Sequence, residues 1–174
     1  MVGDMDAYLQ DLTLLKEIGV ALGNDKMLIR EARFRAAALI RLGRYREAEA
    51  AARRSADNYR RADLPEEEGI SLTIVGRALR ELGAYHDAVS AFHQALQTLE
   101  RANAPIYRIQ ALSYLSTTYW QMGEYEQAYQ CGQKALRICE EHHMPERKRF
   151  AFGDMGAAAV MLGQTETARQ WLQE

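Results

Sequence analysis

The chain has 174 residues, a formal charge of −2, 48% apolar residues and 26% charged residues. This balance excludes a disordered polar chain, and the absence of a basic total charge or a Lys/Arg run argues against nucleic-acid binding. No apolar run approaches the roughly 20 residues that cross a bilayer and no basic and apolar leader opens the sequence, so we expect a cytoplasmic protein without a membrane partner.

A four-residue motif recurs along the chain with a period of 40 residues. It reads Leu-Gly-Arg-Tyr at 42–45, Leu-Gly-Ala-Tyr at 82–85, Met-Gly-Glu-Tyr at 122–125 and Leu-Gly-Gln-Thr at 162–165. A fixed period of this length indicates one supersecondary unit that is repeated and stacked to bury a continuous core. We expect the second half of a preceding repeat at 1–24, repeats at 25–64, 65–104 and 105–144, and a truncated repeat at 145–174.

Each repeat is predicted to be a pair of helices. Pro65, Pro105 and Pro145 share one column, and proline is tolerated in the first turn of a helix, where its missing N–H would be unpaired anyway. About 17 residues later the motif glycine suits a left-handed residue that ends the helix. Apolar and small residues recur at helix spacing on both sides of that glycine. The repeat is therefore a helical hairpin that reverses at the glycine.

This hairpin resembles the tetratricopeptide repeat, whose pattern has a small residue early in the first helix, a turn glycine followed by an aromatic residue, and two small residues in the second helix. The matching positions are Ala36, Gly76, Ser116 and Gly156; Gly43/Tyr45, Gly83/Tyr85 and Gly123/Tyr125; and Ala48/Ser55, Ala88/Ala95 and Ala128/Ala135. Thr165 departs from the aromatic column, and the unit exceeds the usual length of about 34 residues. The resemblance implies an all-α fold, a right-handed superhelical solenoid of antiparallel helix pairs with about nine helices.

Within that family the chain looks most like the sensor arms of bacterial multidomain signalling regulators. The residues that carry this likeness are Leu22-Gly23-Asn24-Asp25 and the series of Leu-Gly-x-Tyr turns. Such arms follow a nucleotide-hydrolysing switch module, which this sequence lacks. The resemblance implies an alternative function, in which the chain is the ligand- or partner-sensing arm of a larger signalling or transcription regulator.

If the hairpins stack as in that family, the concave wall is the face of each first helix opposite its core stripe. That face carries Arg30, Arg33, Ala37, Ile40 and Arg41; Ile70, Thr73, Arg77, Arg80 and Glu81; Gln110, Ser113, Thr117, Trp120 and Gln121; and Phe150, Gly153, Ala157, Val160 and Met161. The groove is therefore expected to run from basic to apolar. In agreement, residues 25–64 hold eleven Lys/Arg against six Asp/Glu, whereas residues 65–104 hold three against six.

A protein or peptide partner, and an acidic one, suits this face. Guanidinium groups bind carboxylates through forked hydrogen bonds, and an accessible Trp is a favoured anchor for a partner. We predict partner contacts at Arg33, Arg41, Arg77, Arg80, Thr117, Trp120 and Gln121. The alternative is structural: the arginines pair with a Glu one turn away, and Trp120 packs against a loop or neighbouring helix.

No catalytic, metal or cofactor site is expected. Cys139, His142 and His143 lie close in sequence, but a structural zinc site needs four ligands and no second pair exists. Cys131 and Cys139 are eight residues apart in one predicted helix, about 12 Å along its axis, too far for a disulfide. Because the glycines are explained by turns or close helix contacts, no phosphate-binding loop or nucleophile motif remains.

The last predicted helix, from Thr165, is about ten residues long, whereas its counterparts run for nearly twenty. Solenoid ends normally need a polar covering repeat, and Ala168, Trp171 and Leu172 leave the last hairpin half covered. We therefore expect either a fragment of a longer chain or a homo-oligomer formed through this C-terminal repeat.

Overall fold

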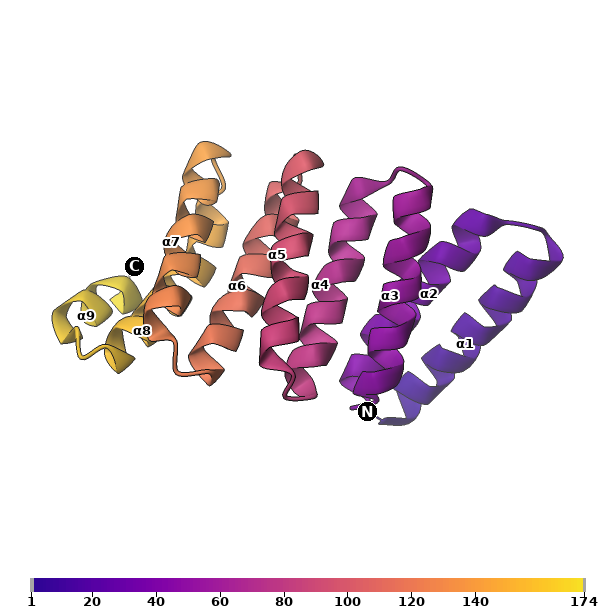
Figure 1. Ribbon diagram of the computed structural model, residues 1–174, viewed down its shortest axis with the longest axis horizontal. Coiled ribbons are helices and arrows are strands. Elements are labelled where there is room, and N and C mark those ends of the chain that lie inside the picture. Colours follow the sequence, from indigo (N-terminus) through magenta and orange to yellow (C-terminus); the bar gives the residue numbers. More distant parts are fainter. Residues whose placement is uncertain (1, 174) are drawn as a thin grey trace.

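The computed structural model describes the backbone of residues 2–173 and the side chains of 7–24, 27–28, 30–164 and 166–171. Leu172, predicted to lie at the C-terminal edge, and the side chains of Asp25 and Thr165 are outside these described residues. Between residues 2 and 173 the fold is all-α (Figure 1). The helices stand side by side across the long axis of the molecule and follow one another along it, which makes a solenoid. The α-helices are α1 (Val2–Ala21), α2 (Asp25–Arg41), α3 (Tyr45–Arg61), α4 (Pro65–Glu81), α5 (Tyr85–Arg101), α6 (Pro105–Gln121), α7 (Tyr125–Glu141), α8 (Lys148–Met161) and α9 (Thr165–Gln173).

The prolines and motif glycines mark the helix boundaries. Pro65 and Pro105 begin α4 and α6. Gly83 ends the turn after α4 with a φ of 77°, in the left-handed region where a side chain would be strained. Pro145 differs from the prediction, because it begins a 3-10 turn, η1 (Pro145–Arg147), and α8 starts only at Lys148. Arg147 has φ −95° and ψ −12°, still right-handed but with a shallower ψ than an ideal α-helix, which accompanies the tighter first turn.

The connections between one hairpin and the next carry a second kind of left-handed residue. Asp63, Asn103 and His143 have φ values of 53°, 50° and 53°. Asp, Asn and His are the side-chain-bearing residues most often found in this conformation, because a short polar side chain tolerates it best. These turns were not predicted, because the recurring four-residue motif lies at the other end of each hairpin.

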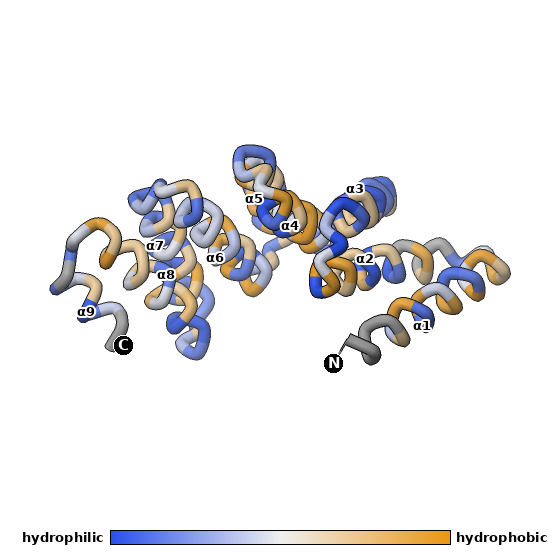
Figure 2. The backbone as a smooth tube through the Cα atoms, turned by 90° about the horizontal axis from the view of Figure 1, so that it is seen from below, coloured by the Kyte–Doolittle hydropathy of each residue, from blue (hydrophilic) through white to orange (hydrophobic). Residues whose placement is uncertain are grey.

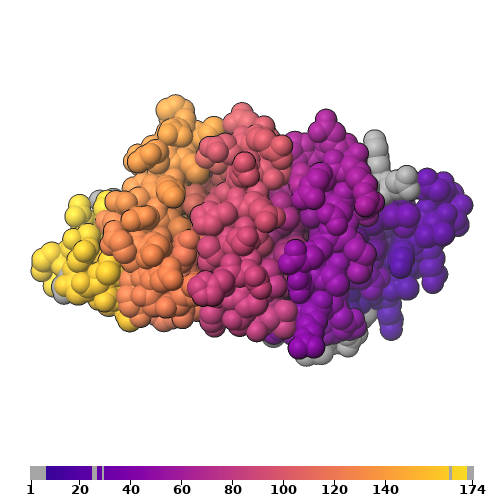
Figure 3. Space-filling model, in the orientation of Figure 1, coloured from indigo at the N-terminus to yellow at the C-terminus, as the bar shows by residue number. Residues whose placement is uncertain are grey.

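Successive helices pack antiparallel. The first helices of the hairpins (α2, α4, α6 and α8) lie on one side of the solenoid, and the second helices (α3, α5 and α7) lie on the other. The first helices also contact one another directly, in the pairs α2 with α4, α4 with α6 and α6 with α8. Among the described residues no comparable contact joins α3, α5 and α7. The first helices therefore form an inner wall and the second helices an outer layer, as the view along the helices shows for α2 and α3 (Figure 2). The outer layer is packed without a gap between helices (Figure 3).

The core lies between the two layers, and small residues of the inner helices admit large side chains of the outer ones. Phe92 of α5 is fully buried against Gly76 of α4. A Cβ on Gly76 would lie 2.7 Å from the nearest ring carbon of Phe92, so the ring occupies space that only glycine leaves open. Ser116, in the same column, donates a hydrogen bond of 3.1 Å to the carbonyl of Ala128. The small residues at this position of the repeat therefore set how closely the two helices of each hairpin approach.

Candidate functional site on the inner wall

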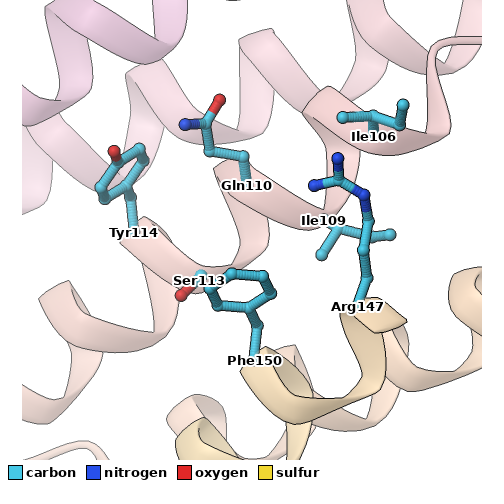
Figure 4. A pocket seen from close by; sticks show the side chains of 7 residues that line it. All are labelled: Ile106, Ile109, Gln110, Ser113, Tyr114, Arg147 and Phe150. Atoms are coloured by element: carbon cyan, nitrogen blue, oxygen red, sulfur yellow. The ribbon is translucent and has the colours of Figure 1, made fainter. Parts of the chain in front are cut away.

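The inner wall carries two neighbouring pockets. The larger, here called the α6–α8 pocket, has a volume of about 310 Å³ and is lined by Ile106, Ile109, Gln110, Ser113, Tyr114, Arg147 and Phe150 (Figure 4). The smaller, the α4–α6 pocket, has a volume of about 150 Å³ and is lined by Ala37, Ile70, Thr73, Ile74, Arg77, Tyr107, Gln110 and Tyr114. Gln110 and Tyr114 line both pockets. The two pockets therefore form one strip that touches four first helices, from Ala37 of α2 to Phe150 of α8, and is centred on α6.

The α6–α8 pocket combines apolar walls with a few polar groups. Ile106 and Phe150 are 43% and 44% exposed, so both present apolar surface to solvent. The Phe150 ring lies beside Ser113, and Arg147 reaches from the start of α8 toward α6 (Figure 4). Pockets that are mostly apolar with a small number of orienting polar groups are the usual form of binding sites. This one is suited to a large apolar side chain.

The α4–α6 pocket holds a guanidinium group with no carboxylate partner among the described residues. The Cζ atom of Arg77 lies 4.7 Å from the centroid of the Tyr114 ring, a cation–π distance. Within that part of the chain Arg77 makes no ion pair, and its Nε is buried without an acceptor. The ring orients the guanidinium but leaves its charge uncompensated. An anion bound on the inner wall could therefore pair with the positive charge of Arg77.

Of the seven predicted contact residues, Arg77 alone lines either of these two pockets. Arg80 also lies over Tyr114, at 5.9 Å, but its largely buried side chain pairs with Glu81, Nε to Oε1 at 3.2 Å. Thr117 donates its hydroxyl hydrogen bond to the carbonyl of Ser113 at 3.0 Å. Arg80 and Thr117 are thus engaged within the protein.

The other four predicted residues lie on the wall outside these two pockets. Trp120 is 45% exposed and meets Tyr125 edge to face, with ring centroids 6.4 Å apart. The guanidinium of Arg33 lies 5.0 Å from the centroid of the neighbouring Phe34 ring. Arg41 and Gln121 are exposed. None of these four is brought next to the strip between Arg77 and Phe150.

Six lining residues were not predicted from the sequence: Tyr114 and Arg147, and also Ile74, Ile106, Tyr107 and Ile109. Tyr114 stands between the core residues Leu112 and Leu115, so the helical pattern alone did not assign it to the wall; its spacing of four from Gln110 was the available signal. Arg147 reaches the pocket from the 3-10 turn that the sequence did not predict.

Asp154 of α8 is hydrogen-bonded to Ser113, which lines the α6–α8 pocket. Burial raises the pKa of its carboxyl group to about 6, and a hydrogen bond from Ser113 partly opposes this shift. Its Oδ2 atom is buried without a hydrogen-bond partner. On α7, burial raises the pKa of the Cys131 thiol to about 12, and the charge of Asp154 adds to the effect. The thiol therefore stays protonated at neutral pH.

Metal-binding clusters and membrane spans are both absent from the part of the chain that the structure describes. These residues contain no group of three or more His, Cys, Asp or Glu side chains placed to hold a metal ion. Within the same residues, no helix is long and apolar enough to cross a membrane.

Comparison with known proteins supports the helical-repeat fold. Models of the tetratricopeptide repeat match residues 71–105 and 107–174. No curated protein sequence matches the chain. A solved Podosopora anserina protein, described as a kinesin light chain with nearly identical TPR-like repeats, is 16% identical with a TM-score of 0.79, over 98% of this chain and 84% of that one.

Two other solved structures are similar over nearly the whole chain. The STAND protein PH0952 of Pyrococcus horikoshii, a signal transduction ATPase with a tetratricopeptide repeat sensor, is 21% identical with a TM-score of 0.76, over 96% of this chain and 28% of that one. A Rap protein complexed with Competence and Sporulation Factor is 14% identical with a TM-score of 0.73, over 98% and 57%. The chain spans 62% and 47% of two further similar structures. At these identities the likeness concerns the fold alone.

Proposed function

The chain belongs to the tetratricopeptide repeat family, and on that premise we propose that it is a non-catalytic scaffold whose inner wall binds a protein or peptide partner. The observation that carries this proposal is the strip of two pockets that share Gln110 and Tyr114. A site spread over four helices suits an elongated ligand better than a compact one. The acidic character of the partner is supported by Arg77, whose charge has no carboxylate partner among the described residues.

A second candidate function is the sensor arm of a larger regulator. It is supported by the similarity to the STAND protein, whose description names a tetratricopeptide repeat sensor. Binding at the same strip would then change the curvature of the solenoid and act on an attached domain. The two candidates share the binding site and differ in the consequence of binding.

We also propose that a second copy of the chain is a partner and that the protein works in the cytoplasm. Val160 and Met161, at the end of α8, are 55% and 46% exposed and offer an apolar surface for self-association. The cysteines are free and buried, as is usual in a reducing compartment.

Affinity capture from a native cell extract tests the scaffold function. The wild-type chain is compared with Ile106→Ala/Phe150→Ala, which removes two exposed apolar side chains and should leave the fold intact. Arg137→Gln on α7, an exposed residue of the outer layer, is the control. Proteins captured by the wild type and the control but lost from the double variant support binding at the wall. Identical sets from all three chains would contradict the proposal.

A further inference from the structure

The chemistry of the strip narrows the kind of partner it can take. At its α4 end, Arg77 is held against the Tyr114 ring with its charge uncompensated among the described residues. A bound carboxylate would supply the missing counter-charge through charge-assisted hydrogen bonds, and a guanidinium suits it because of its forked geometry. A neutral or basic ligand would leave the charge uncompensated.

The α8 end of the strip is suited to an apolar group of the ligand. Ile106 and Phe150 form exposed apolar walls of a pocket of about 310 Å³. Asp154, hydrogen-bonded to the lining residue Ser113, disfavours a second carboxylate deep inside the pocket. Arg147 stands at the rim, where its Nε is 3.9 Å from Glu146. The pocket therefore favours a large apolar side chain over an acidic one.

Between these two ends lies Gln110, which is exposed and lines both pockets. Its amide can both donate and accept hydrogen bonds. An extended peptide has main-chain groups free to meet it, whereas a helix has already paired its own. The middle of the strip thus favours an extended main chain.

Resting on the proposed function, we propose that the strip binds an extended peptide segment of a partner protein in which an Asp or Glu sits on Arg77 and a large apolar side chain fills the α6–α8 pocket. The spacing is set by the helices. Arg77 is on α4, but its guanidinium lies over Tyr114 of α6, which also lines the α6–α8 pocket. The two contacts are therefore at most one and a half helix spacings apart, or about 12–15 Å at the usual 8–10 Å between packed helices. An extended chain covers that distance in about four residues.

Selection from a library of random 12-residue peptides displayed on phage, with the whole chain as target, tests this inference. The expected peptides carry an acidic residue within about four positions of Phe, Trp, Leu or Met. A selected peptide is then labelled with a fluorophore, and its affinity is measured by anisotropy for the wild type, Arg77→Gln, Phe150→Ala and the control Arg137→Gln. We expect the first two variants to weaken binding about tenfold, and the control to change it less than about twofold.

Exchanging the charge of Arg77 with that of the acidic residue of the peptide distinguishes the loss of a direct contact from a general loss of structure. Arg77→Glu should lose the acidic peptide and gain affinity for the same peptide with its Asp or Glu changed to Lys. Circular dichroism confirms that each variant keeps its helix content. Phe150→Ala changes an exposed residue, so it remains informative even if substitution of Arg77 disturbs the Tyr114 ring.

The outcomes distinguish this inference from the function on which it rests. If peptides bind and Phe150→Ala abolishes binding, but they lack the acidic residue or ignore Arg77, the inference is overturned and the scaffold function stands. If no selected peptide depends on either residue, both are overturned. Binding of a single-stranded RNA pool at low salt that is lost in Arg77→Gln would also overturn the inference, because the arginine would then serve a phosphate.

Discussion

Asp154 is a carboxyl group placed where its neutral form is favoured. Its pKa in the folded chain is about 6, against 3.8 for an ordinary aspartate, because burial disfavours the charge. A pKa raised by folding stabilises the fold below the ordinary pKa, and this contribution is lost as the pH rises through the folded pKa. The fold should therefore become less stable between about pH 4 and pH 6, by up to about 3 kcal/mol.

Asp154→Asn should remove this dependence, because an amide carries no charge at either pH. We expect the free energy of unfolding at pH 7.5 to rise by about 1–3 kcal/mol over that of the wild type. At pH 4 the two proteins should be nearly equal. Urea unfolding at both pH values measures this. A variant that is less stable than the wild type at pH 7.5 would show that the carboxylate is satisfied in the folded chain.

The contact between Gly76 and Phe92 predicts opposite effects for two similar substitutions. Gly76→Ala places a methyl group 2.7 Å from the Phe92 ring and should destabilise the fold by about 1–3 kcal/mol through overpacking. Gly153→Ala, also inside a first helix but with open space around it, should stabilise the fold by about 0.5–1 kcal/mol, because alanine favours a helix over glycine. Thermal unfolding of both variants measures the difference. Equal effects would mean that the ring moves aside freely.

At the scale of the element, most helix boundaries could be predicted because their causes are local. Pro65 and Pro105 start helices and Gly83 ends a turn through their own backbone preferences. The site could be predicted only in part. Gln110, Ser113 and Phe150 follow from the helical period, but the stacking of Arg77 on Tyr114 joins residues of different repeats, and the period does not show which side chains meet across helices. The 3-10 turn that positions Arg147 has no clear sequence signal.

The turn between α7 and α8 offers a test of backbone strain. His143 has a φ of 53°, whereas its exposed neighbour His142 has a φ of −105°. His143→Gly should stabilise the fold by about 1 kcal/mol, because glycine adopts the left-handed region without strain. His142→Gly relieves no strain and should be neutral or destabilising. Urea unfolding of the pair tests this, and stabilisation by both or by neither would contradict the assignment of strain to His143.

At the scale of the whole molecule, exposed apolar side chains lie on α1, where Leu14 and Val20 are 57% and 62% exposed, and on the inner-wall helices α6 and α8. Trp120 on α6 and Val160 on α8 occupy matching positions one period apart, and Met161 follows Val160. The first two helices of the wall, α2 and α4, carry Ile40 and Arg80 there, and both of these are far less exposed. Contiguous exposed apolar groups are typical of an interaction surface. The inner wall therefore becomes more apolar toward its α8 end, although its repeats share one pattern.

Self-association is expected to use this apolar end. Light scattering of the wild type should give a mass above that of the 19.8 kDa monomer as the concentration rises, and Val160→Glu should restore the monomer, because it places a charge in the contact. Val20→Glu is the matched control, since Val20 is also exposed but lies on α1 at the other end. If both variants reduce the mass, association is general hydrophobic contact. A wild type that stays monomeric at every concentration would instead leave Trp120 and Val160 free for the partner of the inner wall.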